Sequence, residues 1–269
     1  MIYVNLTGRL GNQLFILEKL LLNIKDGEKS YINIYEYKNG LTADGQAIRF
    51  DAKEILIFPK NIVFIDSKFL YKISKRLSWI YKLILDLFNI SHPHYRSDLF
   101  INLYFIKFLS GYFQNLPNQK VMIEKLIKKR FDIKDPKRLA IHFRQGDYKS
   151  SAHSSHFVVD EDVILKFLKQ FDVNYRIDLY SDSDVDGLLE KIRGLGFSVS
   201  NMSDLLKTDI DIFYELTTYK NIFCSNSSFS WWAAHLFNDE KIIYLPSSWS
   251  KSYLIPCGLI HDRDQIYEI

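Results

Sequence analysis

Cysteine, net charge and long apolar runs are all scarce in this chain of 269 residues. The two cysteines, Cys224 and Cys257, are too few for a disulfide framework or a cysteine-based zinc site, and they are typical of a reducing compartment. The net charge of +3 is too small to indicate a nucleic-acid partner. No uninterrupted apolar run reaches the ~18 residues of a membrane span, and the first residues lack the basic and apolar regions of a signal peptide. We therefore expect a cytoplasmic protein.

What is present is the composition of a globular protein, with 47% apolar and 25% charged residues. Short apolar runs alternate with segments of helical periodicity, which predicts an α/β fold with parallel sheets. The expected strands cover residues 2–6, 31–35, 62–65, 138–143, 175–180, 197–199, 221–224 and 241–245. The expected helices lie near 14–24, 68–90, 120–130, 160–171, 184–194, 208–219 and 228–238. A polar stretch with a proline at 132–137 is the candidate linker between two domains.

Four polar stretches stand between an expected strand and an expected helix. They are residues 7–13, 144–148, 181–184 and 225–230. In a parallel sheet such junctions all lie at the carboxyl edge, which is where open α/β sheets bind their ligands. Their coincidence is more informative than any one of them.

The central stretch of the chain is the apolar run 138–143 with the residues that follow it. Arg144, Gly146 and Asp147 come directly after this expected buried strand. A guanidinium at a strand end offers a planar fork that suits a phosphate group. The alternative interpretation is a surface loop that contains an Arg–Asp pair.

The stretch 225–234 combines a serine-rich helix start with two tryptophans. Backbone amides, hydroxyl groups and the positive end of a helix dipole suit a phosphate group near Ser227 and Ser228. The alternative is that one of these serines caps the helix while Trp231 and Trp232 pack in the core. Both can hold, because capping and anion binding use the same donors. The stretch has no G-x-S-x-G pattern, so we do not predict a serine nucleophile.

The other two junctions partly match a nucleotide-binding glycine motif and a calcium-binding loop, but neither match is complete. The glycines of 7–13 are spaced G-x-x-G, which is neither the dinucleotide fingerprint nor a P-loop. The alternating aspartates of 182–187 match the first half of a calcium loop, but Arg193 stands where a bidentate glutamate is needed. We instead expect Ser181 and Asp182 to cap the next helix, with the Asp182 carboxylate able to accept hydrogen bonds from a base or ribose.

The segment 68–90 is long, aromatic and basic, and it has helical periodicity. Such a helix can lie on an anionic membrane surface. It can also be a packed helix with a solvated basic face. The sequence leaves both interpretations open.

Three motifs, in this order, carry a resemblance to glycosyltransferase family 11, the α-1,2-fucosyltransferases. They are Gly8–Gln13, His142–Tyr148 and the intact Ser225–Ala234, and Leu245-Pro246 with Trp249 also resembles the family. The resemblance covers most of the chain. It implies a GT-B fold with two facing Rossmann-like domains, which we place at 1–134 on the acceptor side and at 135–269 for the nucleotide sugar. It also implies inverting transfer of fucose from GDP-β-L-fucose to a galactoside 2-hydroxyl in surface glycan synthesis, with no metal or other cofactor.

The resemblance further implies roles for individual residues. Arg144 is expected to bind the β-phosphate, with His142 and Asp147 as further catalytic candidates. Either Asp147, His153 or His156 could serve as the general base, or the reaction could need little base assistance. The expected donor-binding residues are Gly11, Asn12, Gln13, His142, Arg144, Ser181, Asp182, Asn226, Ser227 and Ser228.

This chain departs from the family at one position of the central motif. The family usually has a second arginine where Gln145 stands, and glutamine keeps the hydrogen bonds but loses the charge. A related donor such as GDP-colitose, or a non-catalytic glycan- or nucleotide-binding protein, is therefore an alternative.

Overall fold

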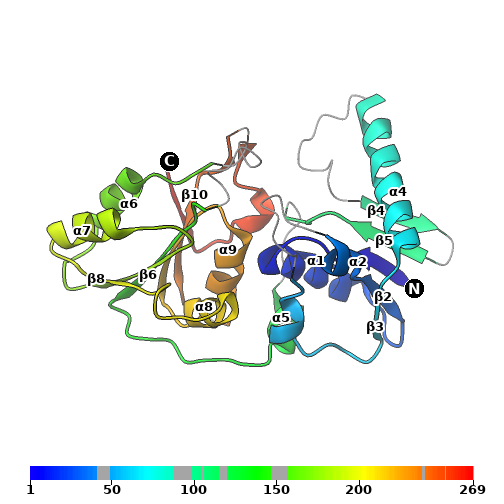
Figure 1. The fold of residues 1–269 in the computed structure, drawn as a ribbon, viewed down its shortest axis with the longest axis horizontal. Helices are drawn as coiled ribbons and strands as arrows, with labels where there is room; N and C mark the ends of the chain where they lie inside the picture. Colours follow the sequence, from blue (N-terminus) through cyan, green and yellow to red (C-terminus); the bar gives the residue numbers. More distant parts are fainter. Residues whose placement is uncertain are drawn as a thin grey trace. The chain divides into compact units, whose positions relative to one another are not determined.

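The computed structural model describes residues 1–40, 49–87, 99–103, 106–114, 120–146, 157–237, 240–251 and 253–268. The chain forms two compact α/β units (Figure 1). Unit 1 comprises Met1–Lys128 and Pro256–Leu259, and unit 2 comprises Lys129–Ile255 and Ile260–Ile269. The brief return of the chain to unit 1 at Pro256–Leu259 is not visible in the sequence pattern.

Unit 1 contains a five-stranded sheet in the order β3-β2-β1-β5-β4. Its strands are β1 (Ile2–Asn5), β2 (Ser30–Asn33), β3 (Ile62–Ile65), β4 (Leu99–Leu103) and β5 (Ile106–Ser110). All neighbours pair in parallel except β4, which runs antiparallel to β5 at the edge. The helices are α1 (Leu10–Asn23), α2 (Tyr35–Asn39), α3 (Ala52–Ile55), α4 (Lys68–Leu87) and α5 (Val121–Leu126).

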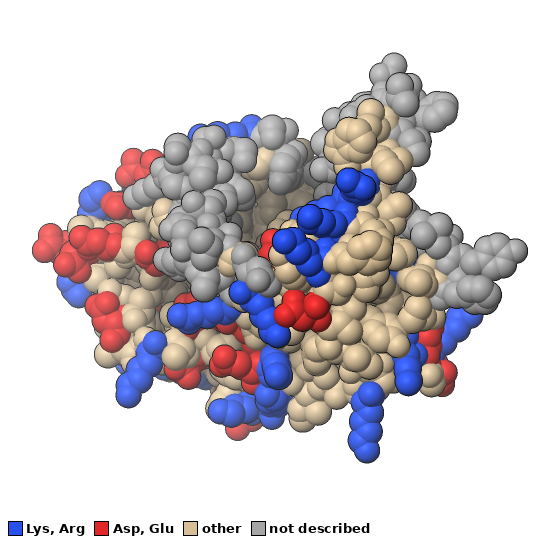
Figure 2. Space-filling model, turned by 45° about the vertical axis from the view of Figure 1, so that its right-hand side comes forward, with Lys and Arg blue, Asp and Glu red and all other residues tan. Residues whose placement is uncertain are grey.

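The predicted long basic helix is confirmed as α4. Lys and Arg side chains gather along it in Figure 2. Residues 88–90 of the predicted segment lie outside the described residues. Within the described part of the chain, no helix has the length and apolar character needed to cross a membrane.

Unit 2 contains a six-stranded, fully parallel sheet in the order β13-β10-β9-β6-β7-β8. Its strands are β6 (Arg138–Phe143), β7 (Arg176–Ser181), β8 (Ser198–Asn201), β9 (Asn221–Cys224), β10 (Ile242–Pro246) and β13 (Asp264–Tyr267). Its helices are α6 (Glu161–Leu168), α7 (Asp186–Gly194), α8 (Asp209–Leu216) and α9 (Ser228–His235). A two-stranded ribbon, β11 (Ser248–Ser250) and β12 (Tyr253–Leu254), follows β10. The apolar runs seen in the sequence become central strands, whose residues Leu139, Ile141 and Ile177 are fully buried.

In each sheet the strand order reverses once. In unit 2 the chain runs from β6 through β7 to β8, then starts again on the other side of β6 with β9. In unit 1 the reversal lies between β1 and β5. Ligands of open α/β sheets bind outside the carboxyl ends of the strands at such a reversal. The predicted α/β class with two Rossmann-like units is confirmed, and among the described strands of the two main sheets only β4 runs antiparallel to its neighbour. The GT-B arrangement of the two units stays a prediction.

One carboxylate lies inside the core of unit 1. Glu18 of α1 is 1% exposed, and it accepts hydrogen bonds from the amides of Met122 (3.3 Å) and Ile123 (2.8 Å) in the first turn of α5. Burial raises its pKa to about 7, although the two amide donors oppose the shift. The carboxylate therefore joins α1 to α5 and takes up a proton near neutral pH.

We predict that Glu18 makes unit 1 less stable as the pH rises. The folded-state pKa of about 7 exceeds the unfolded value of ~4.3, so the folded state binds the proton more tightly between these two pH values. From pH 4.5 to pH 8 the wild type should lose about 3 kcal/mol of stability relative to Glu18→Gln. Denaturant unfolding at several pH values measures this, with Glu190→Gln, on the exposed face of α7, as the control. Parallel pH profiles for the wild type and Glu18→Gln would contradict the prediction.

Candidate functional site

Three of the four predicted junctions meet at the carboxyl edge of the unit 2 sheet. Residues 144–146 follow β6, Asp182 follows β7, and residues 225–227 follow β9. These three strands are neighbours, and β6 and β9 flank the reversal of strand order. The fourth junction, 7–13, lies in unit 1 between β1 and α1, at the reversal of that sheet.

Asp182 holds the turn that carries Arg144. Its Oδ1 atom accepts hydrogen bonds from the amides of Gln145 (2.8 Å) and Gly146 (2.9 Å). Its Oδ2 atom lies 3.0 Å from Nε of Arg144. The two side chains are 17% and 30% exposed, so the pair is partly shielded from water. One side of the guanidinium plane is therefore fixed by the carboxylate, which sets the direction of the fork.

The charge of Asp182 depends on these partners. Burial alone raises the pKa of the carboxyl group, but Arg144 and the amides of Gln145 and Gly146 outweigh burial, so the pKa lies below its usual value. Asp182 is thus ionised at neutral pH. Its stabilising contribution is present above the unfolded-state pKa and is lost as the pH falls through the lower folded-state pKa.

Gly146 is required by the close approach of Asp182. A Cβ atom at this position would lie 2.7 Å from Oδ2 and 2.9 Å from Cγ of Asp182. The Asp182 side chain is short and already bound to Arg144 and to two amides, so it cannot move aside without breaking those contacts. Gly146 is therefore needed for the ion pair between Arg144 and Asp182.

Ser225 joins the ends of β6 and β9. Its side chain is fully buried; the hydroxyl donates to the carbonyl of His142 (2.6 Å) and accepts from the amide of Arg144 (3.0 Å). The Ser225 amide also donates to the His142 carbonyl (3.1 Å). Ser225 is not among the residues predicted to bind the donor, although its place directly after β9 is a signal that could have identified it.

His142 is neutral under ordinary conditions. Burial, and then the nearby charge of Arg144, lower its pKa to about 4. The residue is 7% exposed, and the centroid of its ring lies 5.7 Å from the ring centroid of Phe229. Among the residues that the structure describes, none forms a hydrogen bond with its Nδ1 atom. A buried polar atom of this kind is suited to a ligand or water partner.

The start of α9 differs from the capping interpretation at Ser227. Ser227 occupies the N-cap position, but its side chain makes no capping hydrogen bond, and the helix begins at Ser228. Trp231 and Trp232 are fully buried, as expected. Asn226 is also buried, and its side-chain amide donates to the carbonyls of Phe157 (2.8 Å) and Trp249 (2.9 Å). Asn226 thus braces the loop that precedes α9.

Ser181 and Asp182 do not cap α7, contrary to expectation. The helix begins only at Asp186, whose amide is bound by the carboxylate of Asp184 (3.0 Å). The Ser181 hydroxyl instead accepts from the amide of Ser183 (3.2 Å). Asp182 is bound to the turn after β6, because the adjacent strand end competes successfully for its carboxylate.

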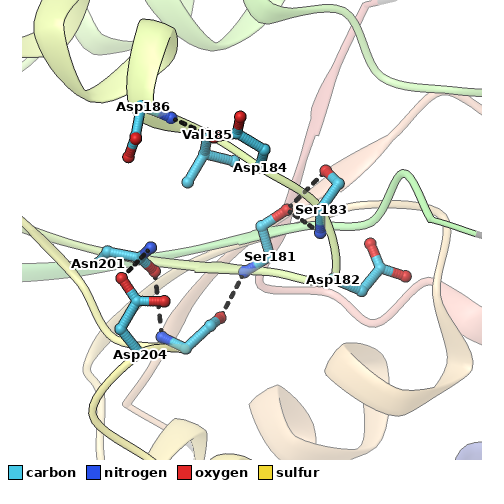
Figure 3. Close-up of a pocket in the computed structure, with 9 residues that line it drawn as sticks. Ser181, Asp182, Ser183, Asp184, Val185, Asp186, Asn201 and Asp204 are labelled. Atoms are coloured by element: carbon cyan, nitrogen blue, oxygen red, sulfur yellow. Dashed lines mark hydrogen bonds between the residues drawn. The ribbon is translucent and has the colours of Figure 1, made fainter.

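A polar pocket of about 380 Å³ lies beside this turn (Figure 3). It is lined by Ser181, Asp182, Ser183, Asp184, Val185, Asp186, Asn201, Ser203 and Asp204. Figure 3 shows the hydrogen bonds that join Asn201 to Asp204 and the Ser181 backbone to Ser203. The lining is rich in acceptors, which suits a ligand that offers N–H or O–H donors. Among the described residues, no cluster of three or more His, Cys, Asp or Glu side chains could hold a metal ion.

In unit 1 the predicted site residues have two different roles. Gln13 is fully buried, donates to the carbonyls of Gly8 (2.9 Å) and Arg49 (2.7 Å), and accepts from the amide of Ala52 (2.9 Å). Gln13 thus holds the turn, while Gly11 is buried within α1. Asn12 accepts from Gln114 (3.2 Å), which follows β5.

The loops at the unit 1 reversal are constrained by their backbones. Gly8 has φ +76°, and a Cβ atom there would lie 3.0 Å from the Asn12 side chain. Phe113, next to Gln114, has φ 55° and is 1% exposed. A buried non-glycine residue in the left-handed region is a strained arrangement that is concentrated at functional sites. Asp147, His153 and His156 lie outside the described residues.

Fold and site together define an α/β protein with a fixed arginine at the ligand-binding edge of a parallel sheet. The sequence model of Glycosyl transferase family 11 matches residues 108–255, more than half of the chain, and the chain belongs to that family. It is therefore a glycosyltransferase, and its partners are a nucleotide-sugar donor and a glycan acceptor.

Comparison with other known proteins adds little to the family assignment. A solved structure described as the glycosyl transferase family 9 from Veillonella parvula DSM 2008 is similar over 99% of this chain and 86% of that one, with 10% identity and a TM-score of 0.46. No curated protein matches this chain.

We predict that Gly146→Ala disturbs the Arg144 turn. The new methyl group must displace Asp182, which should cost about 1–3 kcal/mol of stability and weaken the binding of GDP at least tenfold. Gly187→Ala is the matched control, because a Cβ atom there meets nothing within 4 Å. Titration calorimetry with GDP and thermal unfolding test the pair. If the two variants had the same GDP affinity and the same thermal stability, the close approach of Asp182 to Gly146 would not matter for binding.

Proposed function

We propose that the protein is an inverting α-1,2-fucosyltransferase that moves L-fucose from GDP-β-L-fucose to the 2-hydroxyl of a galactoside, in the cytoplasm, during surface glycan synthesis. The family supplies the reaction class. The observation that carries the proposal is the fixed guanidinium of Arg144 at the β6–β9 reversal. A charged fork held there is suited to a diphosphate leaving group.

The leaving group determines what the site must do. When the bond to fucose breaks, negative charge develops on the β-phosphate of GDP. A transferase that works without a metal ion must neutralise this charge with protein donors that are already in place. Arg144, fixed by Asp182, and the amides at the start of α9 are the donors that we assign to this role.

Asp182 and His142 support this step without supplying positive charge. A carboxylate has about four acceptor positions, and three of those on Asp182 are used by Arg144 and two amides. The last position and the adjacent polar pocket suit the N–H and O–H groups of guanine or ribose. His142, neutral above its pKa of about 4, offers Nδ1 to the same ligand.

We infer that inversion proceeds through a largely dissociative, oxocarbenium-like path. In such a path the departure of GDP leads, and the acceptor hydroxyl loses its proton late, so little base assistance is needed. Asp182 is a poor general base, because its pKa lies below the usual value and its oxygens are bound to Arg144 and the turn. For Asp147, the remaining catalytic candidate, we propose that it helps to orient Arg144.

We predict that Arg144→Ala lowers kcat by about 10²–10³-fold or more, because an oriented donor to the developing charge is lost. Arg144→Lys should recover only part of the rate, since lysine has no planar fork. GDP release and product formation from GDP-fucose and lactose measure the effect, with Arg193→Ala, exposed on α7, as the control. A wild-type kcat in Arg144→Ala would show that Arg144 does not stabilise the leaving group.

Gln145 bears on the identity of the donor. The family usually has an arginine here, but in this chain the side chain is 6% exposed and its amide donates to the carbonyl of Val159 (3.3 Å). Position 145 therefore braces the segment before α6. Its missing charge does not remove the fork that Arg144 provides.

We accordingly predict a preference for GDP-fucose when it competes with GDP-colitose for one acceptor. The ratio of the two products, measured by mass spectrometry in a single reaction, tests this. A majority of colitosylated product would favour the alternative donor. Tight binding of GDP-fucose with no turnover on any galactoside would instead identify a non-catalytic binding protein.

A further inference from the structure

Helix α4 is tied to the unit 1 sheet by polar contacts near its start. Asn33, 1% exposed at the end of β2, accepts from the amide of Ser67 (3.0 Å) and donates to the Ser67 carbonyl (2.9 Å). Asn5, at the end of β1, donates to the hydroxyl of Ser74 (2.6 Å). These buried contacts fix the first two turns of the helix against the carboxyl ends of two strands. The rest of α4 continues beyond this anchor (Figure 1).

The anchored half of α4 presents cations to solvent. Lys68, Lys72, Lys75 and Arg76 are all exposed. No aspartate or glutamate occurs between Lys68 and Leu85. Figure 2 shows this concentration of Lys and Arg side chains along one side of the helix. The positive field is therefore local to α4, although the whole chain has a net charge of only +3.

The next turns of α4 present large apolar side chains. Trp79 is 64% exposed, Ile80 47% and Leu83 39%. Leu83 follows Trp79 by four residues and Ile80 by three, so both side chains neighbour Leu83 on the helix surface. Phe69, at 72%, lies on the same side of the helix nearer its start. Neighbouring exposed apolar groups rimmed by charge indicate an interaction surface.

We propose that α4 docks the protein on an anionic lipid surface. With a rise of ~1.5 Å per residue, the apolar group at 79–83 lies about 13 Å along the axis from the middle of the cationic group. This separation matches a tip that enters the boundary between headgroups and acyl chains, ~5–10 Å deep, with the cations at the level of the lipid phosphates. The polar anchor at Asn5 and Asn33 keeps the helix fixed to the sheet while its far end inserts.

The arrangement favours lipid over other polyanions. A nucleic acid would engage the cations but would leave Trp79, Ile80 and Leu83 in water. A lipid surface uses both groups at once. The helix carries five cationic residues, and their charge limits insertion to its apolar far end.

Vesicle co-sedimentation of the full-length protein tests the proposal. Phosphatidylcholine vesicles with and without one quarter phosphatidylglycerol are compared at low and high salt. The wild type should bind the anionic vesicles, and Lys72→Glu with Arg76→Glu should weaken binding at least tenfold. Lys166→Glu with Lys169→Glu, at exposed positions in the last turn of α6 and directly after it, makes the same change of net charge and should leave binding unchanged.

Tryptophan fluorescence tests the apolar half of the proposal. Of the four tryptophans, Trp231 and Trp232 are fully buried and Trp249 is 7% exposed, so Trp79 dominates any response to lipid. We expect a blue shift on addition of anionic vesicles, which Trp79→Phe abolishes while the protein still sediments with them. The triple variant Trp79→Ser, Ile80→Ser and Leu83→Ser should not sediment with the vesicles even at low salt.

Three outcomes would overturn the docking proposal. They are the absence of binding, equal binding by the Lys166/Lys169 variant pair and the Lys72/Arg76 pair, and binding that survives the triple serine replacement. The last would identify a general polyanion surface. Transfer to soluble lactose is measured on the same variants, so that a loss of the proposed activity is distinguished from a loss of membrane docking.

Discussion

The carboxyl edge of the unit 2 sheet depends on the negative charge of one side chain, Asp182. The carboxylate is half enclosed, and its burial is unfavourable by itself. It is stabilised because it receives the guanidinium of Arg144 and the amides of Gln145 and Gly146 at the same time. Asp182 in turn fixes the orientation of Arg144, whose long side chain would otherwise rotate freely. Charge, turn geometry and the need for a small residue at 146 thus have one common cause.

The two units use the same construction with different residues. Each sheet reverses its strand order once, and in each a side chain ties together the two loops that flank the reversal. In unit 2 the tie is Ser225, which binds the backbone at His142 and Arg144. In unit 1 it is the contact between Asn12 and Gln114. Unit 2 places a cation at its reversal, whereas the tie in unit 1 is made of neutral amides, which suits hydroxyl groups more than phosphates.

The sequence was sufficient for the strands around the site and for the position of Arg144. A buried apolar run that ends in charged residues constrains the local chain strongly. The partners of Arg144 could not be predicted, because Asp182 lies 37 residues from Gln145 and Ser225 lies 81 residues from Arg144. Local preference even gave the wrong role for Asp182: a helix cap was expected, and the neighbouring strand end took the carboxylate. The edge strands β4 and β13 were not predicted either. Edge strands form because they pair with a neighbouring strand, and their sequences carry little periodic signal.

The short return of the chain at Pro256–Leu259 limits how this protein can be divided. Leu259 is fully buried, and the segment belongs to unit 1, yet β13 of unit 2 follows it in the chain. No single cut therefore yields two complete halves. During synthesis both units gain further pieces from the 14 residues Pro256–Ile269, so neither unit can reach its complete structure before this segment has been made. Removal of Pro256–Ile269 would therefore disturb both units.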